Sequence, residues 1–468
     1  MPSNQKRPDR HALILAAGKG TRMNSERAKV LHPVCGKPLI QHVLERLENL
    51  DIRTTVLVLG HHAEKVEEAV SGFGVQIVLQ REQLGTGHAI MSARAQLEKL
   101  SGSLLVLYGD MPLIPSQELE HLFQIREQED VDQVLLTAIL DTPFGYGRIL
   151  RNERGEAIDI VEEQEATSEQ KLIKEVNTGL NCFKIKSLFA SLSQLSRNNS
   201  AAEYYLTDLL CIHRSTGKKV AVLESRSPED LLGVNTREEL AVVEGKMRNE
   251  IARRWMLEGV TMLDPSSVYI DPTVVIGRDT VLYPGVILEG QTVIGPDCTI
   301  RGFCHLSDAT IKKGVVIDHC SVVRSSKVGA GSHVGPFAHL RANTVVAGSC
   351  RIGNFVELKN TRFGDSSKAA HLSYLGDTDV GRGVNIGAGT ITCNYDGQKK
   401  HKTVIEDRAF IGSGTQLVAP VSIQEEAYIA AGSSITEDVP PQSLGIARSR
   451  QINKPGWGKG RRKRNDPE

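Results

Sequence analysis

The chain of 468 residues is longer than one hydrophobic core ordinarily supports, so its length predicts two or three domains. Lysine plus arginine and aspartate plus glutamate each number 56, and this balance argues against nucleic acid or an anionic membrane as a partner. No segment has the pattern of a signal peptide or a membrane-spanning helix, so we expect a cytoplasmic protein that acts on small molecules. The eight cysteines include no Cys-x-x-Cys pair, which predicts reduced thiols instead of a zinc module or a disulfide framework.

Aliphatic runs alternate with helical segments in the N-terminal half of the chain. Strands are predicted at 11–16, 55–59 and 104–108, and helices at 39–50 and 63–70. This alternation is typical of a Rossmann-like α/β domain with a largely parallel sheet.

The first predicted strand runs into a glycine-rich turn, Leu15-Ala16-Ala17-Gly18-Lys19-Gly20-Thr21-Arg22-Met23. Small residues at such a turn let backbone N–H groups approach a phosphate or a base closely. The turn matches neither the Walker phosphate loop nor the three-glycine dinucleotide fingerprint. By itself it also fits a tight strand-to-helix connection that binds no ligand.

The same stretch, followed by Ala28-Lys29-Val30-Leu31, resembles the sugar-1-phosphate nucleotidyltransferases. The resemblance implies that Arg22 and Lys29 are catalytic, because cations must neutralise the charge that spreads over a transferring phosphoryl group. Solvated surface charge is the alternative for both residues. Ala28 departs from the family, which usually has proline there, and we expect a less rigid loop with unchanged charge placement.

Further nucleotidyltransferase motifs follow in order along the chain. The resemblance implies that UTP or the UDP-sugar contacts Leu15, Ala16, Ala17, Gly18, Lys29, Gln80, Gly85, Thr86, Tyr108, Gly147, Glu162, Asn177 and Asn235. Of these, Gln80, Gly85 and Thr86 face the uracil and ribose in the family. Gly147, Glu162 and Asn177 correspond to the family's sugar-binding positions.

A metal ligand is expected at Asp110, which follows the strand at 104–108. Ligands of an open parallel sheet bind beyond the carboxyl ends of its strands. A carboxylate oxygen at this place suits Mg²⁺, and the family pairs it with the asparagine that corresponds to Asn235. An aspartate after a strand can instead cap a helix.

A connecting helix is predicted at 236–257, between a domain of residues 1–235 and a domain of residues 258–453. It begins at Thr236-Arg237-Glu238-Glu239, a possible capping box, and continues with Leu240, Val243, Met247 and Ile251 at helical spacing. The hydrophobic period changes just beyond this segment, which supports a domain boundary there.

From about residue 265 an aliphatic residue recurs at every sixth position. One frame contains Ile276, Leu282, Leu288, Ile294, Ile300 and Leu306. A second frame runs in steps of six from Val316 and Val322 to Leu358, and the pattern continues at Val380 and Ile386. The last frame runs from Ile405 to Ile435. A flat-sided coil has period six, because each hexad supplies one short strand and one turn. An ordinary β-sandwich is the alternative. Segments 359–379 and 392–404 break the frame and are predicted to leave the coil as loops.

The hexads resemble those of the hexapeptide-repeat acyltransferases, which implies a left-handed parallel β-helix. Together with the N-terminal motifs, residues 11–453 resemble the bifunctional N-acetylglucosamine-1-phosphate uridyltransferase/glucosamine-1-phosphate acetyltransferase family. The resemblance implies that residues 258–453 acetylate glucosamine 1-phosphate with acetyl-CoA as co-substrate. Residues 1–235 then join N-acetylglucosamine 1-phosphate to UTP with Mg²⁺. It also implies a homotrimer, and the basic tail 454–468 is predicted to be disordered.

The residues of the acetyl-transfer site are carried over from the same family. His371, in His371-Leu372-Ser373-Tyr374-Leu375-Gly376-Asp377, is the implied general base, since a histidine accepts protons near neutral pH. The sugar phosphate is implied to contact Arg341, Lys359, Tyr374 and Asn385, and acetyl-CoA to contact Ala388, Asn394, Tyr395, Ser413, Ala431 and Arg448. His339 and Ala342-Asn343 depart from the family's usual Arg and Pro-Gly, and we expect altered affinity from these changes.

Two rival interpretations remain at this stage. The chain could be a binding or regulatory subunit, or a monofunctional nucleotidyltransferase whose β-helix serves only for assembly. A binding subunit would not need Arg22, Lys29 and Asp110 together. Neither a binding subunit nor a monofunctional nucleotidyltransferase would need His371 together with Lys359. The sequence therefore favours an enzyme with two active sites.

Overall fold

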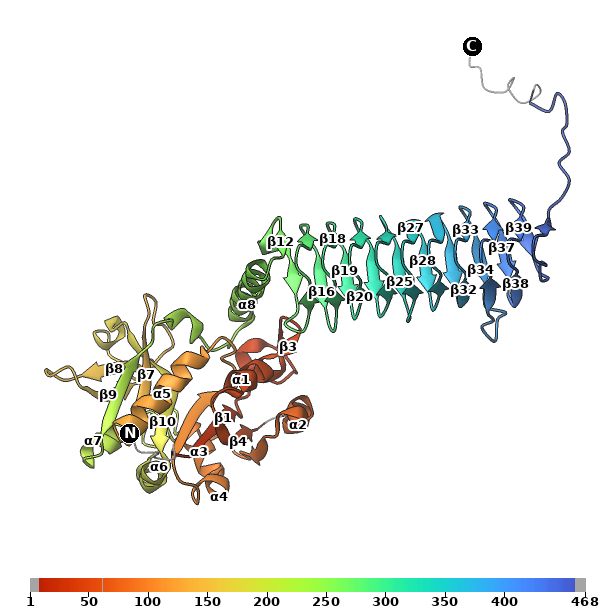
Figure 1. The fold of residues 1–468 in the computed structure, drawn as a ribbon. Helices are drawn as coiled ribbons and strands as arrows, with labels where there is room; N and C mark the ends of the chain where they lie inside the picture. Colours follow the sequence, from red (N-terminus) through yellow and green to blue (C-terminus); the bar gives the residue numbers. More distant parts are fainter. Residues whose placement is uncertain (1–7, 61, 459–468) are drawn as a thin grey trace, which may run out of the picture. The chain divides into compact units, whose positions relative to one another are not determined.

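The computed structural model describes residues 8–60 and 62–458, and the basic run Lys459–Arg464 lies outside them (Figure 1). The chain forms two compact units, Met1–Met247 and Arg248–Glu468. Helix α8, Arg237–Leu257, contains the point of division. Across the described ranges, no helix is both long and apolar enough to cross a membrane.

The N-terminal unit is built on a nine-stranded sheet, counted over the described residues, with the main order β11-β7-β10-β6-β1-β4-β5. Its strands are β1 Arg10–Ala16, β4 Ile52–Leu59, β5 Gln76–Leu79, β6 Ser103–Tyr108, β7 Gln133–Ile139, β8 Arg148–Arg151, β9 Ala157–Val161, β10 Glu175–Lys184 and β11 Val220–Glu224. β1 pairs in parallel with both β4 and β6, whereas β10 runs antiparallel to its neighbours β6 and β7. The largely parallel sheet predicted from the sequence is confirmed.

Helices cover both faces of this sheet. They are α1 Leu39–Leu47, α2 Ala63–Val70, α3 Thr86–Ser92, α4 Arg94–Leu97, α5 Ser116–Gln128, α6 Ile185–Ser191 and α7 Leu209–Ser215, and a short ribbon of β2 Pro33–Val34 and β3 Lys37–Pro38 precedes α1. Alternate side chains of β1 enter two different cores: Ala12 and Ile14 pack with α1 and α5, while Leu13 and Leu15 pack with α3 and α6. A strand buried on both faces explains the continuous apolar run in the sequence.

Helix α7 carries a buried histidine. His213 is fully buried, and among the described residues neither ring nitrogen makes a well-formed hydrogen bond. Its ring meets Phe183 edge-on at 6.1 Å between centroids. Burial, and then the nearby Lys218 ammonium, lower the pKa of His213 from 6.5 to about 4. The imidazole is therefore neutral in the folded chain at neutral pH.

Lowering the pH from 7.5 to 5 is expected to cost the N-terminal unit about 2 kcal/mol through His213 alone. Below its ordinary pKa of 6.5 the unfolded chain binds a proton that the folded chain, with a pKa of about 4, does not bind. Stability is therefore lost as the pH falls through this window. Calorimetric unfolding at the two pH values measures the loss, which His213→Leu should largely remove. An equal loss in this variant would contradict the assignment, and the partly exposed His121 provides a control substitution, His121→Leu.

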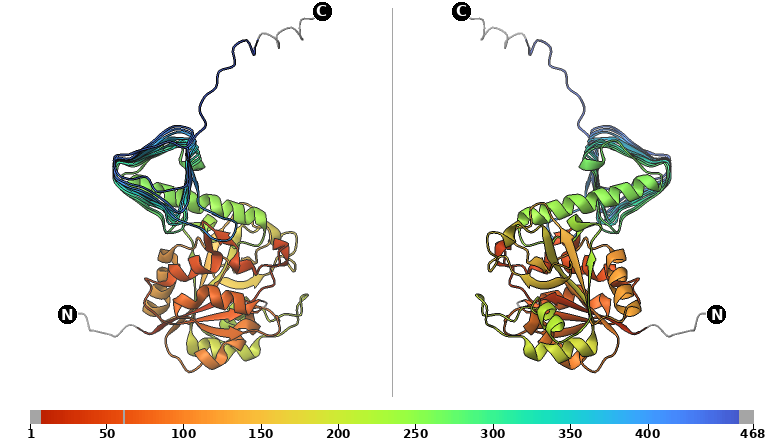
Figure 2. Two further views of the ribbon diagram at one scale, coloured as in Figure 1. Left: turned by 90° about the vertical axis from the view of Figure 1, so that its right-hand side faces the viewer. Right: turned by 90° about the vertical axis from the view of Figure 1, so that its left-hand side faces the viewer.

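The C-terminal unit is a parallel coil with three faces and a triangular cross-section (Figure 2). The first face contains β12 Thr261–Met262, β15 Val281–Leu282, β18 Thr299–Ile300, β21 Val316–Ile317, β24 His333–Val334, β27 Arg351–Asn354, β30 Lys368–His371, β33 Asn385–Ile386, β36 Phe410–Ile411, β39 Tyr428–Ile429 and β41 Leu444–Gly445. The second contains β13 Tyr269–Ile270, β16 Ile287–Glu289, β19 His305–Ser307, β22 Val322–Arg324, β25 His339–Arg341, β28 Glu357–Lys359, β31 Tyr374–Gly376, β34 Ile391–Cys393, β37 Gln416–Val418 and β40 Ser434–Ile435. The third contains β14 Val275–Ile276, β17 Val293–Ile294, β20 Thr310–Ile311, β23 Lys327–Val328, β26 Val345–Val346, β29 Arg362–Phe363, β32 Thr378–Val380, β35 Thr403–Ile405 and β38 Val421–Ile423. This stack is consistent with the expected left-handed β-helix, and the β-sandwich alternative is excluded.

Two details of the six-residue frame were predicted wrongly. The inward residues of one coil are Ile317 and Val323, whereas Val316 and Val322 are half-buried, because the turn before β20 is one residue shorter than a hexad allows. Segment 359–379 does not leave the coil, since Phe363, Ala369 and Leu375 occupy its inward positions. Only the second break forms a loop, residues 394–402 between β34 and β35.

The three edges of the coil share one backbone conformation but carry different side chains. Each edge repeats a residue with positive φ, and at two edges these are mostly Asp, Asn, Ser or Gly, the residues that tolerate it best. The edge between the first and second faces instead has an apolar ridge, Phe303, Cys320, Phe337, Phe355 and Leu372, followed by Gly389, Gly414 and Gly432. The four larger side chains of the ridge are 49–71% exposed. An L-residue in this conformation costs roughly 1–2 kcal/mol, so the ridge stores strain without gaining burial inside its own unit.

The predicted capping box is present at the start of α8. The Glu239 N–H donates to Thr236 Oγ1 at 3.1 Å, and Glu239 Oε2 accepts from the Thr236 N–H at 3.0 Å. The same carboxylate oxygen accepts from the Asn235 N–H at 2.5 Å. The helix start therefore also fixes the backbone of an expected metal ligand.

Candidate functional site

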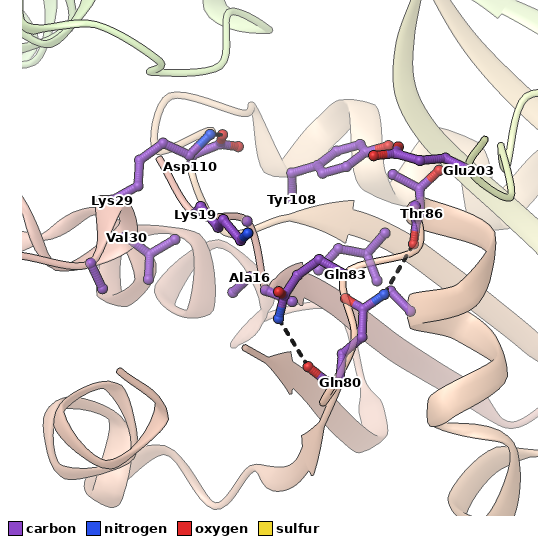
Figure 3. A pocket seen from close by; sticks show the side chains of 16 residues that line it. Ala16, Lys19, Lys29, Val30, Gln80, Gln83, Thr86, Tyr108, Asp110 and Glu203 are labelled. Carbon is purple, nitrogen blue, oxygen red and sulfur yellow. Dashed lines mark hydrogen bonds and ion pairs between the residues drawn. The ribbon is translucent and has the colours of Figure 1, made fainter. Parts of the chain in front are cut away.

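A cavity of about 430 Å³ opens at the carboxyl ends of β1 and β6 (Figure 3). Its lining includes the predicted nucleotide-site residues Leu15, Ala16, Ala17, Gly18, Lys29, Gln80, Gly85, Thr86, Tyr108 and Asp110. It also includes Lys19, Ala28, Val30, Gln83, Ala89 and Glu203, which the sequence did not assign to the site. Glu203 lies more than 90 residues from Asp110 in the chain, and no motif placed it there.

The glycine-rich turn is shaped around Lys29. Gly20 has φ +62°, and a Cβ on it would lie 2.8 Å from the Lys29 Cβ. A side chain at this position would therefore displace Lys29 as well as strain the turn. Arg22, in the 3-10 helix Thr21–Met23, is exposed and does not line the cavity.

Lys29, Asp110 and Asn235 converge on one point. The Lys29 ammonium donates to Asp110 Oδ2 in a short ion pair and to Asn235 Oδ1 at 3.1 Å. The backbone holds the two oxygen ligands together, because the Val234 N–H donates to the Asp110 carbonyl at 2.9 Å. One carboxylate and one amide oxygen fit a magnesium site, in which phosphates and water supply the other ligands. Within the described residues, no cluster of three His, Cys, Asp or Glu side chains offers a protein-only metal site.

The three expected sugar-binding residues lie together beside the cavity but do not line it. The Asn177 N–H donates to the Gly147 carbonyl at 2.8 Å, and a Cβ on Gly147 would lie 3.4 Å from Glu162 Oε2. Glu162 Oε1 accepts from the Thr207 hydroxyl at 3.1 Å, and burial raises the pKa of this carboxyl. Burial, and then Glu162 and Asp110, raise the pKa of Tyr108, so this ring lies between the sugar residues and the metal ligands.

On the β-helix, three expected sugar-phosphate residues share the second face. The strand register places Arg341, Lys359 and Gly376 on adjacent coils, and Tyr374 begins the same strand as Gly376. A Cβ on Gly376 would clash with the Tyr374 hydroxyl oxygen and would lie 2.8 Å from Asn394 Nδ2. Asn385 lies on the first face, so one chain does not bring all four residues onto one surface.

His371 ends β30 directly before the apolar edge and is exposed. Its neighbour in the register is Asn354, and His371 Nδ1 lies 2.6 Å from Asn354 Oδ1. An amide oxygen only accepts, so Nδ1 carries the proton and Nε2 has a free lone pair. This tautomer is the one that a general base requires.

Asp377 organises the cations at the edge between the second and third faces. Its carboxylate accepts from Lys359 Nζ at 2.9 Å and from Asn394 Nδ2 at 2.5 Å. Burial opposes charge on Lys359, but Asp377 outweighs it, so the pKa of Lys359 is raised. The pKa of Lys400, on loop 394–402, is lowered by the Lys359 ammonium beside it. Sequence reasoning missed Lys400, although Lys399-Lys400-His401-Lys402 is a visible basic run next to the Asn394 motif.

The expected acetyl-CoA residues fall in two places. One edge of the coil carries Ala388, Ser413, Ala431 and Arg448. Hydrogen bonds link them from coil to coil: the Gly414 N–H donates to the Ala388 carbonyl at 2.7 Å, and the Gly432 N–H donates to the Ser413 carbonyl at 2.8 Å. The Arg448 guanidinium donates to the Ala431 carbonyl at 2.8 Å. Asn394 and Tyr395 lie at the next edge, on loop 394–402. The first group continues along the same edge beyond His371, where Gly389, Gly414 and Gly432 stand in place of the Phe and Leu residues of the ridge.

These features define a transferase with a nucleotidyltransferase-type cavity in one unit and an acyltransferase-type coil in the other. The MobA-like NTP transferase domain family matches residues 12–178, and the GMPPB C-terminal domain family matches residues 265–363. The bifunctional protein GlmU of Geobacillus sp. strain WCH70 is 48% identical over 96% of this chain and 97% of its own, and that of Brevibacillus brevis is 46% identical over 95% and 96%. The GlmU of Exiguobacterium sibiricum is 48% identical over 95% and 99%. The chain belongs to the family of bifunctional GlmU proteins, so the sequence-based assignment to uridyltransferase/acetyltransferase enzymes is confirmed.

Proposed function

We propose that the C-terminal unit transfers acetyl from acetyl-CoA to glucosamine 1-phosphate, and that the N-terminal unit joins the product to a uridyl group from UTP and releases pyrophosphate. The presence of the Lys29–Asp110–Asn235 cluster and the His371–Asn354 pair in one chain carries the proposal. We assign the reactions to residues 258–453 and 1–235, with 236–257 as the connection. Acetyl-CoA and UTP are cytoplasmic metabolites, so we place the enzyme in the cytoplasm.

For uridyl transfer, the cavity brings cations to a phosphate. The sugar phosphate attacks the α-phosphate of UTP, and negative charge spreads over the transferring group. Lys29 lines the cavity and can neutralise this charge, and exposed Arg22 can swing in from the adjacent turn. The small residues Ala16, Ala17 and Gly18 leave room for phosphate against the backbone N–H groups.

Asp110 and Asn235 are the residues that would hold Mg²⁺. Their two oxygens already share the Lys29 ammonium, which supports binding of a cation at this point. The ion would supply charge neutralisation for the triphosphate. With a cation held by these two oxygens, the Lys29 ammonium would be available to phosphate.

For acetyl transfer, the proposed base lies at the edge between the first and second faces, and the phosphate-binding cations lie toward the edge between the second and third faces. Lys359, Arg341 and Lys400 can hold the phosphate of glucosamine 1-phosphate. His371 Nε2 then takes a proton from the amine as the amine nitrogen attacks the thioester carbonyl. The C–S bond breaks, and the imidazolium returns this proton to the departing sulfur, so coenzyme A leaves as the thiol. The glycines that follow Ala388, Ser413 and Ala431 leave this edge without large side chains, which supports binding of an extended coenzyme arm there.

The apolar ridge supports a homotrimer with acetyl sites between chains. The phenyl rings of Phe337 and Phe355 stack at 5.2 Å and remain half-exposed, although each occupies a conformation that Asp or Asn tolerates better. Burial against another copy would offset both the exposure and the strain. This contact would also bring a second chain next to His371. The second chain could then supply the sugar-phosphate contact that Asn385 cannot make within one chain, because Asn385 lies on the first face and the other three residues lie on the second.

Replacing both rings, Phe337→Asn with Phe355→Asn, is expected to dissociate the trimer to a 51.1 kDa monomer. Each phenyl ring contributes roughly 2 kcal/mol when buried, and asparagine suits the positive φ, so the coil itself should remain folded. Light scattering measures the mass, and acetyl transfer should fall at least about tenfold while uridyl transfer persists. Asp308→Asn, at another edge with the same φ sign, is the matched control. An intact trimer in the double variant, or a monomeric wild type, would refute the interface.

One assay tests the proposed function directly. Purified protein is incubated with glucosamine 1-phosphate, acetyl-CoA, UTP and Mg²⁺, and products are identified by mass spectrometry with each co-substrate omitted in turn. UDP-N-acetylglucosamine should form from the full mixture, and N-acetylglucosamine 1-phosphate should accumulate without UTP. Product only from supplied N-acetylglucosamine 1-phosphate would show that the β-helix serves assembly and would overturn the acetyl-transfer proposal.

A further inference from the structure

Gln80 is a buried residue in the wall of the N-terminal cavity whose main chain is fully engaged. It follows β5 and is 4% exposed. Its N–H donates to the Leu59 carbonyl at 2.8 Å, and its carbonyl oxygen accepts from Gln83 Nε2 at 3.1 Å (Figure 3). The backbone N–H is used and the backbone oxygen already accepts one hydrogen bond, so the side-chain amide is the group of Gln80 best placed to select a ligand.

Two acceptors hold the nitrogen of that amide. Gln80 Nε2 donates to the Gly85 carbonyl at 3.1 Å and to His88 Nδ1 at 3.0 Å. A backbone carbonyl is only an acceptor, so a rotated amide would place its oxygen against the Gly85 oxygen. Both amide hydrogens are thus used within the protein, and no described residue donates to Gln80 Oε1.

His88 is itself held as an acceptor. Its ring lies on α3, two residues after Thr86, and stacks on Tyr204 at 6.3 Å with an interplanar angle of 23°. Because Gln80 donates to Nδ1, the neutral ring carries its proton on Nε2. Without this acceptor, one amide hydrogen of Gln80 would lack a partner and the amide would be free to turn.

We infer that His88 is a positioning residue for base selection: it holds the Gln80 amide so that only Oε1 faces the base, which favours uracil over cytosine. The inference rests on the proposed placement of uracil at Gln80. Uracil presents a donor at N3, which matches Oε1, whereas cytosine presents an acceptor there. A site built around one hydrogen-bond pattern rejects the base that leaves its buried polar groups unpaired.

The test compares kcat/KM for UTP and CTP with N-acetylglucosamine 1-phosphate in four proteins: wild type, His88→Leu, His88→Asn and Gln80→Leu. His88→Leu removes the acceptor, while asparagine places Oδ1 where the histidine has Nδ1. We expect the UTP:CTP ratio to fall about tenfold in His88→Leu and to stay within about threefold of wild type in His88→Asn. The ratio does not depend on the fraction of folded enzyme, because both nucleotides are measured on the same preparation.

The outcomes distinguish the placement of uracil at Gln80 from the positioning role of His88. Equal losses for UTP and CTP in His88→Leu would mean that His88 only supports the fold, and would overturn the inference. A collapse of the ratio in His88→Asn as large as in His88→Leu would overturn it as well. If the ratio is unchanged even in Gln80→Leu, the uracil does not lie at Gln80, and the proposed nucleotide placement fails rather than the role of His88 alone. A ratio lost in Gln80→Leu and His88→Leu but kept in His88→Asn supports both.

Discussion

Asp110→Asn is expected to reduce uridyl transfer by about 10²-fold or more and to leave acetyl transfer unchanged. The substitution keeps the size of the side chain but removes the negative charge that pairs with the Lys29 ammonium. A neutral amide is a weaker magnesium ligand than a carboxylate. Pyrophosphate release from UTP and N-acetylglucosamine 1-phosphate measures the first activity, and release of free coenzyme A thiol measures the second.

The metal requirement gives this prediction a second readout. If Asp110 holds the ion, half-maximal activation of the residual uridyl transfer should need a higher Mg²⁺ concentration in the variant than in wild type. Asp51→Asn is the matched control, because Asp51 is exposed and lies in neither site. Loss of both activities in a folded Asp110→Asn protein would contradict separate active sites. Unchanged uridyl transfer would remove Asp110 from the site.

Most of the lining of the N-terminal cavity could be predicted from the sequence, because these residues come from local motifs at strand ends. Ala16 ends β1, while Gly18 and Asp110 come just after β1 and β6, and these buried parallel strands end at one edge of the sheet. Glu203 could not be found this way. It reaches the cavity on an irregular segment that packs against Gly85, whose added Cβ would lie 2.6 Å from the Tyr204 carbonyl oxygen. Contacts of this kind depend on tertiary packing and have no period in the sequence.

The β-helix was predictable in outline because one inward residue per hexad produces a regular period. The errors arose where the turn into the third face is one residue short, which moved the apparent frame from Ile317 and Val323 to Val316 and Val322. The same shortening made 359–379 look like a loop, although Phe363 and Ala369 keep the core filled. A search for strict spacing cannot distinguish a short turn from an insertion.

The apolar ridge can be recognised only from the backbone conformation and not from the sequence. In the sequence, Phe303, Phe337 and Phe355 are isolated aromatic residues, and 71% exposure of one of them would be unremarkable. Their common edge and common positive φ make them a single surface. That surface stops at Leu372, beside His371, and glycines follow at the same edge, so the large apolar side chains end at the proposed base.

His371→Gln is expected to reduce acetyl transfer by about 10³-fold, the contribution of a well-placed general base, with uridyl transfer unchanged. Glutamine retains hydrogen bonding but cannot accept the amine proton. Asn354→Leu should cause a smaller loss, about tenfold, because the imidazole remains but its Nδ1 proton loses the oxygen at 2.6 Å that selects the tautomer. Release of coenzyme A thiol at saturating substrates measures both effects, and His333→Gln, on the first face two coils away, is the control. If His371→Gln kept most of its activity, or if Asn354→Leu were as damaging as His371→Gln, the amine would lose its proton to another group and the proposed acetyl site would have to be moved.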